Sequence, residues 1–144
     1  MSKSILNAER ESLDVLVRHF HAKDVASVLD TESATPKPWD EKTIVRYSQD
    51  RHGIIKVAEM KERHYVVGHL CVRVCEHQLR IDKVAVKPGF RKQGVGERLL
   101  REALDIGKRI RLPVSFPIRE TDLPSQLWLR SRGWICYRIA KDYF

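Results

Sequence analysis

The stretch KVAVKPGFRKQGVGERLL (residues 83–100) joins a predicted strand to a predicted helix, and it contains Arg91, Gly94 and Gly96 at the junction. Glycines leave the backbone N–H groups of such a turn uncovered, and the N-terminus of a helix carries partial positive charge. The third glycine of a dinucleotide-binding fingerprint and the Gly-Lys-Ser/Thr of a Walker loop are absent. The residues alone therefore leave two interpretations open: a site for a phosphate group, or only a tight strand-to-helix turn.

The segment after the glycines predicts an amphipathic helix that packs on a sheet. Its apolar residues recur at helical spacing, while charged residues occupy the positions between them. The predicted apolar stripe consists of Val95, Leu99, Leu100, Ala103 and Leu104.

The strand before the glycine turn contains an irregularity. Leu79 and Ile81 keep the period of two, but the next apolar pair, Val84 and Val86, comes one residue too late. A β-bulge at Asp82–Lys83 would restore the phase. The alternative is that so short a pattern misleads.

The rest of the chain alternates strand and helix patterns. Proline disfavours helical geometry in the residue before it, so TPKPW (35–39) ends one helix, and Asp40 is the expected N-cap of the next. Strands are predicted at 12–20, 53–60, 65–78, 79–88, 112–118 and 134–144, and further helices at 23–34, 41–49 and 123–132. This order predicts an α/β (α+β) fold with one central sheet and about four helices.

Size and composition favour one domain over residues 1–144, with a flexible segment at 1–11. The chain has 144 residues, of which 42% are hydrophobic, enough for a substantial core. No stretch resembles a signal peptide or approaches the roughly 20 apolar residues of a spanning helix. We expect a soluble cytoplasmic protein without a membrane partner.

Charge and cysteine content agree with this expectation. Lys and Arg outnumber Asp and Glu by 27 to 19, which gives a net charge of +8. Such a balance favours anionic partners, but the charges are scattered, so nucleic-acid binding is weakly supported. The odd set of Cys71, Cys75 and Cys136 suits reduced thiols in a cytosol.

A metal site on the strand that carries Cys71 and Cys75 is not expected. The predicted strand places five polar or cysteine side chains on one face, namely His69, Cys71, Arg73, Cys75 and His77. In an extended strand Cys71 and Cys75 lie about 13 Å apart, whereas zinc ligands lie about 2.0–2.3 Å from the metal. The cysteines are expected to be small core residues.

The glycine-containing stretch resembles the acyl-CoA-binding motif of the GNAT (GCN5-related) N-acetyltransferases. That motif reads R/Q-x-x-G-x-G/A, and Arg91, Gly94 and Gly96 fill it. The resemblance runs from about residue 14 to 144. PKPW (36–39), IRETD (118–122), WLRSRGW (128–134) and KDYF (141–144) are similar to segments of the bacterial ribosomal-protein N-terminal acetyltransferase branch.

The resemblance implies a V-shaped opening between the fourth and fifth strands (79–87 and 112–118) that holds pantetheine. It places a bulge in the fourth strand, where a backbone N–H faces the thioester carbonyl. Asp122 occupies the position of an asparagine that contacts the cofactor. The implied acetyl-CoA-binding residues are Val84, Ala85, Val86, Arg91, Lys92, Gln93, Gly94, Val95, Gly96, Glu97 and Asp122.

The catalytic positions of that branch are not filled. Its general-base glutamate falls on Pro117 and its general-acid tyrosine on Leu129, and its last strand has no counterpart before Phe144. The other candidate groups are Glu76, His77, Glu120 and Asp122 as base, and Tyr137 and Tyr143 as acid. Of these, Glu76, Glu120 and Tyr143 are the expected catalytic residues.

The sequence thus predicts a monomeric or homodimeric N-acetyltransferase that moves an acetyl group from acetyl-CoA to a protein N-terminus or another primary amine, without a metal. The alternative is a catalytically inactive acyl-CoA-binding module that regulates a partner. Trp39 would either line an acceptor pocket or pack its loop onto the sheet, and the second interpretation is preferred.

Overall fold

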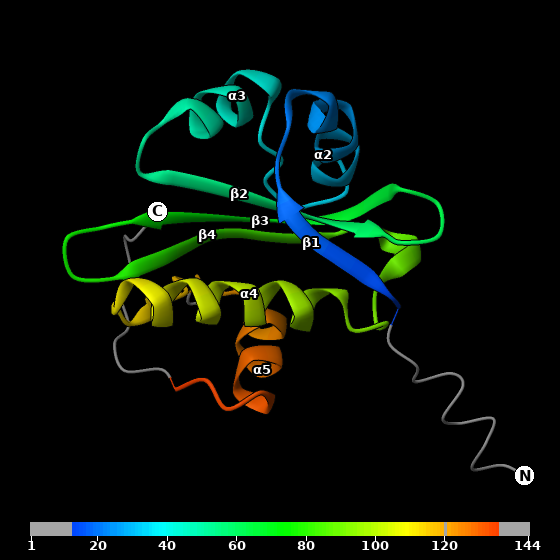
Figure 1. Ribbon diagram of the computed structural model, residues 1–144. Helices are drawn as coiled ribbons and strands as arrows, with labels where there is room; N and C mark the ends of the chain where they lie inside the picture. The colour runs from blue at the N-terminus through cyan, green and yellow to red at the C-terminus, as the bar shows by residue number, and fades with distance from the viewer. Residues whose placement is uncertain (1–12, 120, 136–144) are drawn as a thin grey trace, which may run out of the picture.

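The computed structural model describes residues 13–119 and 121–135 and contains one five-stranded sheet (Figure 1). The strands lie in chain order, and each is antiparallel to its neighbour except the last pair, which is parallel. The sheet is therefore mixed and mostly antiparallel, as predicted. Its strands are β1 (Val15–His19), β2 (Gly53–Met60), β3 (Tyr65–Val74), β4 (Leu79–Val86) and β5 (Val114–Ser115).

Helices cover both faces of the sheet. Figure 1 shows α2 (Val25–Glu32) and α3 (Glu41–Gln49) on one face, and α4 (Val95–Ile110) and α5 (Leu123–Ser131) on the other. Two short 3-10 turns, Ala22–Asp24 and Pro88–Phe90, precede α2 and α4. The predicted N-cap of α3 is confirmed, since the Asp40 side chain accepts a hydrogen bond from the Thr43 N–H at 2.8 Å.

The predicted β-bulge is present in β4. Cys71 pairs with Lys83 and Val72 pairs with Ile81, so Asp82 has no partner on β3. The bulge restores the phase of the strand, because the four apolar residues on either side of it all contribute to the same core cluster: Leu79, Ile81, Val84 and Val86.

A second irregularity lies between β2 and β3 and was not predicted. Ala58 pairs with Gly68 and Glu59 pairs with Val66, so Val67 is the extra residue. Its side chain is fully buried in the same cluster as the apolar face of β4. Val66 and Val67 are adjacent and both apolar, so the stretch YVVGHL shows no clear break in period, which is why the pattern does not reveal this bulge.

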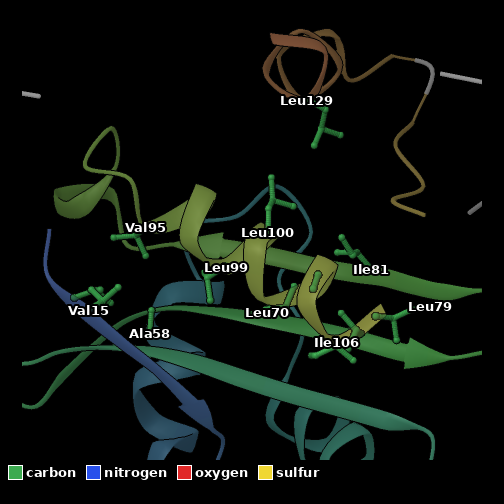
Figure 2. Close-up of a cluster of buried hydrophobic side chains, with 13 residues drawn as sticks. Val15, Ala58, Leu70, Leu79, Ile81, Val95, Leu99, Leu100, Ile106 and Leu129 are labelled. Carbon is green, nitrogen blue, oxygen red and sulfur yellow. The ribbon is translucent and has the colours of Figure 1, made fainter. Parts of the chain in front are cut away.

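Two apolar cores lie on the two faces of the sheet. The core beneath α4 contains Leu70, Leu79, Ile81, Leu99 and Leu100, and Figure 2 shows Leu129 of α5 pointing towards it. The core beneath α2 and α3 contains Val28, Ile44, Tyr47, Ile55, Val57, Val66 and Cys71. Cys71 is a core residue as expected, and burial raises the pKa of its thiol.

The prediction that Leu104 belongs to the buried stripe of α4 is wrong. Leu104 is 47% exposed, and the stripe continues through Ile106 and Gly107 instead. At about 100° per residue, Leu104 lies about 160–180° around the helix from Val95 and Ile106, on the side away from the sheet. Leu100 remains buried because α5 covers it.

Four predicted strands differ in length from the observed ones. β4 ends at Val86 rather than at residue 88, because Pro88 begins a 3-10 turn. β1 begins at Val15 rather than at residue 12, and β3 ends at Val74 because a turn begins there, in which the Cys75 N–H donates to the Gln78 carbonyl at 2.9 Å. β5 has two residues rather than seven, since Pro113 and Pro117 flank it and cannot donate to a ladder. The predicted last strand lies largely outside the described residues, and Trp134 and Ile135 are not in a strand.

No helix within 13–119 and 121–135 combines the length and the apolar composition that crossing a membrane requires.

Candidate active site

The edge of β4 that faces β5 is open for most of its length. The two strands pair at Leu79–Val114 and Arg80–Ser115, and the register between the described residues goes no further. Within residues 13–119 and 121–135 no strand pairs with this edge beyond Arg80, and an edge of this kind can pair with an extended ligand that carries its own amides. This is the predicted splay between the fourth and fifth strands. The predicted cofactor residues Val84, Ala85 and Val86 all lie on the open length of β4.

The turn from β4 to α4 depends on backbone conformations that glycine favours. Gly94 is the N-cap of α4 and has φ of +84°, in the left-handed region. Lys92, two residues earlier, has φ of +63°. Left-handed residues within a turn direct successive N–H groups inward, which forms a concave anion-binding surface. Gly94 is therefore required by the backbone and not only by space.

The first turn of α4 has unpaired backbone donors. The first intrahelical bond runs from the Arg98 N–H to the Gly94 carbonyl at 3.0 Å, so the N–H groups of Val95, Gly96 and Glu97 precede the hydrogen-bond ladder. Gly94 provides no side-chain cap. A helix of 16 residues adds its dipole at this end. These amides fit the pyrophosphate of an acyl-CoA.

Gly96 has a different role from Gly94. A Cβ on Gly96 would lie 3.2 Å from Trp128 Cζ2, so the missing side chain lets α5 pack against the first turn of α4. Glu97 forms an ion pair with Arg132, whose guanidinium carbon lies 5.0 Å from the centre of the Trp128 ring. This pairing compensates the negative charge of Glu97 near the predicted phosphate site.

The remaining loop residues of the motif lie together. Arg91 Nε donates to the Val86 carbonyl at 3.3 Å, and Gln93 Nε2 donates to the Gly89 carbonyl at 3.4 Å. The Gln93 carbonyl accepts the Leu13 N–H at 2.8 Å, which ties the loop to the start of the described chain. The structure thus brings the predicted cofactor residues of β4 and the loop into one continuous surface.

The three positions that fall on family site residues are occupied as follows. Asp122 is the N-cap of α5 and accepts the Ser125 N–H at 3.2 Å. Leu129 is 5% exposed and contributes to the core beneath α4. Pro117 lies in the non-strand segment after β5. Asp122 therefore has a structural function, and its predicted contact with a cofactor stays a prediction.

The structure does not bring Glu76 to the open edge of β4. Glu76 and His77 lie in the turn before β4, where their side chains are 86% and 87% exposed. This is the end at which β4 and β5 pair, and the bulge at Asp82 lies further along the strand. The other predicted catalytic residues, Glu120, Tyr137 and Tyr143, lie outside the described residues.

The polar groups beside the bulge were missed as candidates. Asp82 Oδ2 accepts a hydrogen bond from the Tyr47 hydroxyl at 2.9 Å, and Oδ1 accepts one from Arg80 Nε at 2.6 Å. Burial and the charge of Asp82 raise the pKa of Tyr47, which therefore stays protonated. The adjacent charged residues Asp82 and Lys83, at the break in the apolar period of the strand, were the signal that pointed to this site.

A second polar cluster lies beneath Lys83. Glu32 Oε2 lies 2.6 Å from His69 Nε2, and Oε1 lies 3.1 Å from Lys83 Nζ and accepts the Trp39 N–H at 2.8 Å. Burial raises the pKa of Glu32, but the His69 and Trp39 hydrogen bonds and the charges of His69 and Lys83 outweigh it, so the net pKa is lowered. No local pattern indicates this cluster, because its members come from separate elements.

The preferred interpretation of Trp39 agrees with the structure. Its ring lies 5.3 Å from that of Tyr47, and it packs against the core beneath α2 and α3. The loop that carries it is thereby held on the sheet, on the same face as the Asp82 and Lys83 side chains.

The fold and the site define a class: a single α/β domain whose last two strands diverge, with an uncapped helix N-terminus after the fourth strand. The family model of the acetyltransferase (GNAT) family matches residues 24–134. The chain belongs to this family.

Similar proteins agree with this membership. A protein of Bacillus subtilis (strain 168), named as a candidate ribosomal protein bS18-alanine N-acetyltransferase, is 25% identical over 138 residues, covering 89% of this chain and 85% of that protein. The ribosomal-protein-S18-alanine N-acetyltransferase of Escherichia coli has a similar structure, with a TM-score of 0.77, 18% identity, and coverage of 91% of this chain and 84% of that one.

A third similar structure contains a ligand. The structure of AAC(6')-Iy in complex with the bisubstrate analogue CoA-S-monomethyl-acetylneamine has a TM-score of 0.75, 13% identity, and coverage of 91% of this chain and 97% of that one. At such identities the structural similarities show the fold alone. With the family membership, they confirm the predicted fold, the family and an N-acetyltransferase that acts on an amine.

Proposed function

We propose that this enzyme acetylates the free N-terminal amine of a protein, with acetyl-CoA as co-substrate. The observation that carries the proposal is the bulge at Asp82 in β4, the strand that leads through the glycine loop into the uncapped first turn of α4. The names of the Bacillus and Escherichia relatives support a protein that begins with alanine as the acceptor. The net charge of +8 is compatible with an anionic partner such as a ribosome.

The residues of the chain fit each part of acetyl-CoA. The amides of Val95, Gly96 and Glu97 would bind the pyrophosphate, and Arg91 and Lys92 add positive charge beside it. Backbone groups of β4 would pair with the amides of pantetheine. Acetyl-CoA supplies the activated acetyl group as a thioester.

The bulge would stabilise charge on the thioester oxygen. An extra residue leaves part of the strand outside the ladder, and Asp82 has no partner on β3. A backbone N–H at the bulge would donate to the oxyanion that forms when the amine attacks the carbonyl carbon. The carbon–sulfur bond then breaks, and the CoA thiolate leaves.

The acceptor amine would approach from the face that carries α2 and α3. α4 covers the opposite face of the sheet (Figure 1), where its Val95 and Leu99 belong to the apolar core. On the open side, the Asp82 carboxylate would take the proton that the attacking ammonium group must lose. As the amide forms, the nitrogen loses a second proton, and this proton reaches the thiolate. Glu120 and Tyr143 stay proposed as additional groups that transfer protons.

We place the enzyme in the cytoplasm, where ribosomal proteins are made. The free thiols of Cys71 and Cys75 agree with a reducing compartment.

One assay tests the function against its alternative. The full chain is incubated with acetyl-CoA and a hexapeptide with a free N-terminal alanine; release of CoA and the mass of the peptide are followed. An N-acetylated peptide of the same sequence is the control. We expect CoA release with the free peptide and none with the N-acetylated control. Tight binding of acetyl-CoA without release, for any free amine tried, would instead support the inactive binding module.

A further inference from the structure

Glu32 is a buried carboxylate whose oxygens bind groups from three other parts of the fold. Its side chain is 1% exposed, at the C-terminal end of α2. It contacts His69 on β3, Lys83 at the bulge of β4, and the backbone N–H of Trp39 in the loop between α2 and α3. A buried charge without such partners is strongly unfavourable, so each contact restrains the others.

The same contacts hold the loop at 33–40 against the bulge. Lys83 Nζ donates to the Lys37 carbonyl at 2.9 Å and lies 5.5 Å from the centre of the Trp39 ring. The Thr35 hydroxyl donates to the Glu32 carbonyl at 2.8 Å. The loop is therefore attached at Thr35, Lys37 and Trp39 to two residues, Glu32 and Lys83, that also contact each other.

The contact between Glu32 and His69 fixes the position of the carboxylate on the side of β3. His69 is fully buried on β3, and its Nδ1 has no hydrogen-bond partner among the described residues. Glu32 is thus the group that orients the imidazole, and the imidazole in turn restricts the carboxylate to one rotamer. The loop and the bulge are joined through a rigid intermediate.

We propose that Glu32 is a positioning residue that locks the 33–40 loop against the β4 bulge through Lys83 and so forms the acceptor side of the active site. This inference rests on the proposed function, in which the amine approaches the bulge from the α2 and α3 face. Neither Glu32 nor Lys83 lies in the glycine turn or on its helix, and β4 would contact acetyl-CoA through its backbone, so the side-chain contact between Glu32 and Lys83 is not part of the acetyl-CoA site.

The first test separates acceptor binding from cofactor binding. Glu32→Gln and Lys83→Met are compared with wild type, using the hexapeptide with a free N-terminal alanine as acceptor. We expect the KM for the peptide to rise about tenfold or more, with the affinity for acetyl-CoA, measured by calorimetry, within about twofold of wild type. Glu62→Gln, which removes an exposed carboxylate in the β2–β3 turn, is the matched control and leaves both values unchanged.

The second test reads the loop directly and needs no turnover. The Trp39 N–H donates to the Glu32 side chain, so its hydrogen exchange, followed by NMR, reports closure of the loop. We expect exchange to become about tenfold faster or more in Glu32→Gln and Lys83→Met but not in Glu62→Gln.

The outcomes are distinguishable. Unchanged Trp39 exchange in both variants overturns the inference whatever the enzyme does. Unchanged peptide KM in an active enzyme overturns the acceptor function and leaves the proposed acetyl transfer intact. If wild type acetylates no peptide, the proposed function fails, and the exchange measurement alone decides whether Glu32 locks the loop.

Discussion

Gly94 is the residue whose backbone decides whether the cofactor loop can form. Its φ of +84° places it in the left-handed region, where a β-branched side chain is strained by about 1–3 kcal/mol. Gly89 in the same loop offers a contrast, because a Cβ there would meet nothing within 4 Å.

Gly94→Val should therefore weaken acetyl-CoA binding by about tenfold or more, since the N–H groups of the first turn of α4 would no longer converge. Gly89→Ala should leave the affinity within about twofold of wild type. Isothermal calorimetry with acetyl-CoA measures both. Equal affinities for the two variants would show that the loop does not bind the phosphate groups.

Asp82 is the carboxylate at the β4 bulge, where the proposed mechanism places the thioester carbonyl. Asp82→Asn keeps the size of the side chain but cannot accept the ammonium proton, so kcat/KM should fall about 100-fold while acetyl-CoA affinity is retained. Asp105→Asn, an exposed change on α4, is the control. Wild-type activity in Asp82→Asn would transfer the role of base to another group, with Glu120→Gln as the next variant.

The lowered pKa of Glu32 predicts that the free energy of unfolding depends on pH in a specific way. Its pKa in the folded chain lies below the ordinary value of 4.5, so the ionised carboxylate stabilises the fold above that value, and this contribution is lost as the pH falls through the lower folded pKa. The groups that face it are His69, Lys83 and, more distantly, Cys71.

The measurement compares the free energy of unfolding in urea between wild type and Glu32→Gln. Glu32→Gln should be destabilised relative to wild type by more at pH 7 than in acid, after the pH has fallen through the lowered folded pKa of Glu32. Other carboxylates with lowered pKa, such as Asp24, titrate in both proteins and cancel in the difference. A destabilisation independent of pH would contradict the assigned ion pairs.

At the scale of elements, α5 packs on α4, and Leu129 of α5 contributes to this packing at the position where the general-acid tyrosine of the family branch falls. Leu129 packs into the core, and Trp128 lies against Gly96 at the first turn of α4. α5 thus supports the cofactor loop by packing. A tyrosine hydroxyl at residue 129 would lie in an apolar core rather than beside a leaving thiolate.

Leu129→Ala should lower the free energy of unfolding by about 2–5 kcal/mol, because a buried leucine is replaced by a cavity. Leu127→Ala on the same helix removes a side chain that is 55% exposed, and should change stability by about 0.5 kcal/mol or less. Urea unfolding followed by tryptophan fluorescence measures both. A small effect at residue 129 would mean that α5 does not pack as the structure shows.

At the scale of the whole molecule, ligand binding and folding are linked. Acetyl-CoA would contact β4, the loop and α4 at once, so it should stabilise the folded chain against the unfolded one. At a free concentration of about 100 times Kd the gain is about 2.7 kcal/mol. Thermal unfolding with acetyl-CoA should show a higher midpoint for wild type, but not for Gly94→Val at the same concentration. A midpoint that acetyl-CoA leaves unchanged in wild type would argue against a cofactor site.

The net charge of +8 acts over the whole surface and does not define a site. Several basic residues are already paired, including Arg18 with Asp24 and Glu59, and Lys56 with Glu102. A general preference for anionic partners remains, but the charge does not distinguish a ribosomal acceptor from others.

Local patterns predicted a large part of the fold and half of the site. The phase break between Ile81 and Val84 indicated the bulge, and Asp40 indicated the start of α3, because both signals depend only on residues close in sequence. The prediction that Leu104 is buried was wrong, because an apolar residue at helical spacing does not reveal how wide the buried face of the helix is. The second bulge, at Val67, was not predicted, because Val66 and Val67 are both apolar and the sequence shows no break in period there.

The sequence by itself determined the cofactor half of this protein, since the glycine turn, the bulge and the helix behind them are contiguous and each follows from local backbone physics. Only the tertiary structure decided the acceptor half. Glu32, His69 and Lys83 lie on three elements separated by up to 51 residues, and a buried ion cluster has no periodicity that a sequence pattern can show. It becomes visible when the sheet brings its members within hydrogen-bonding distance.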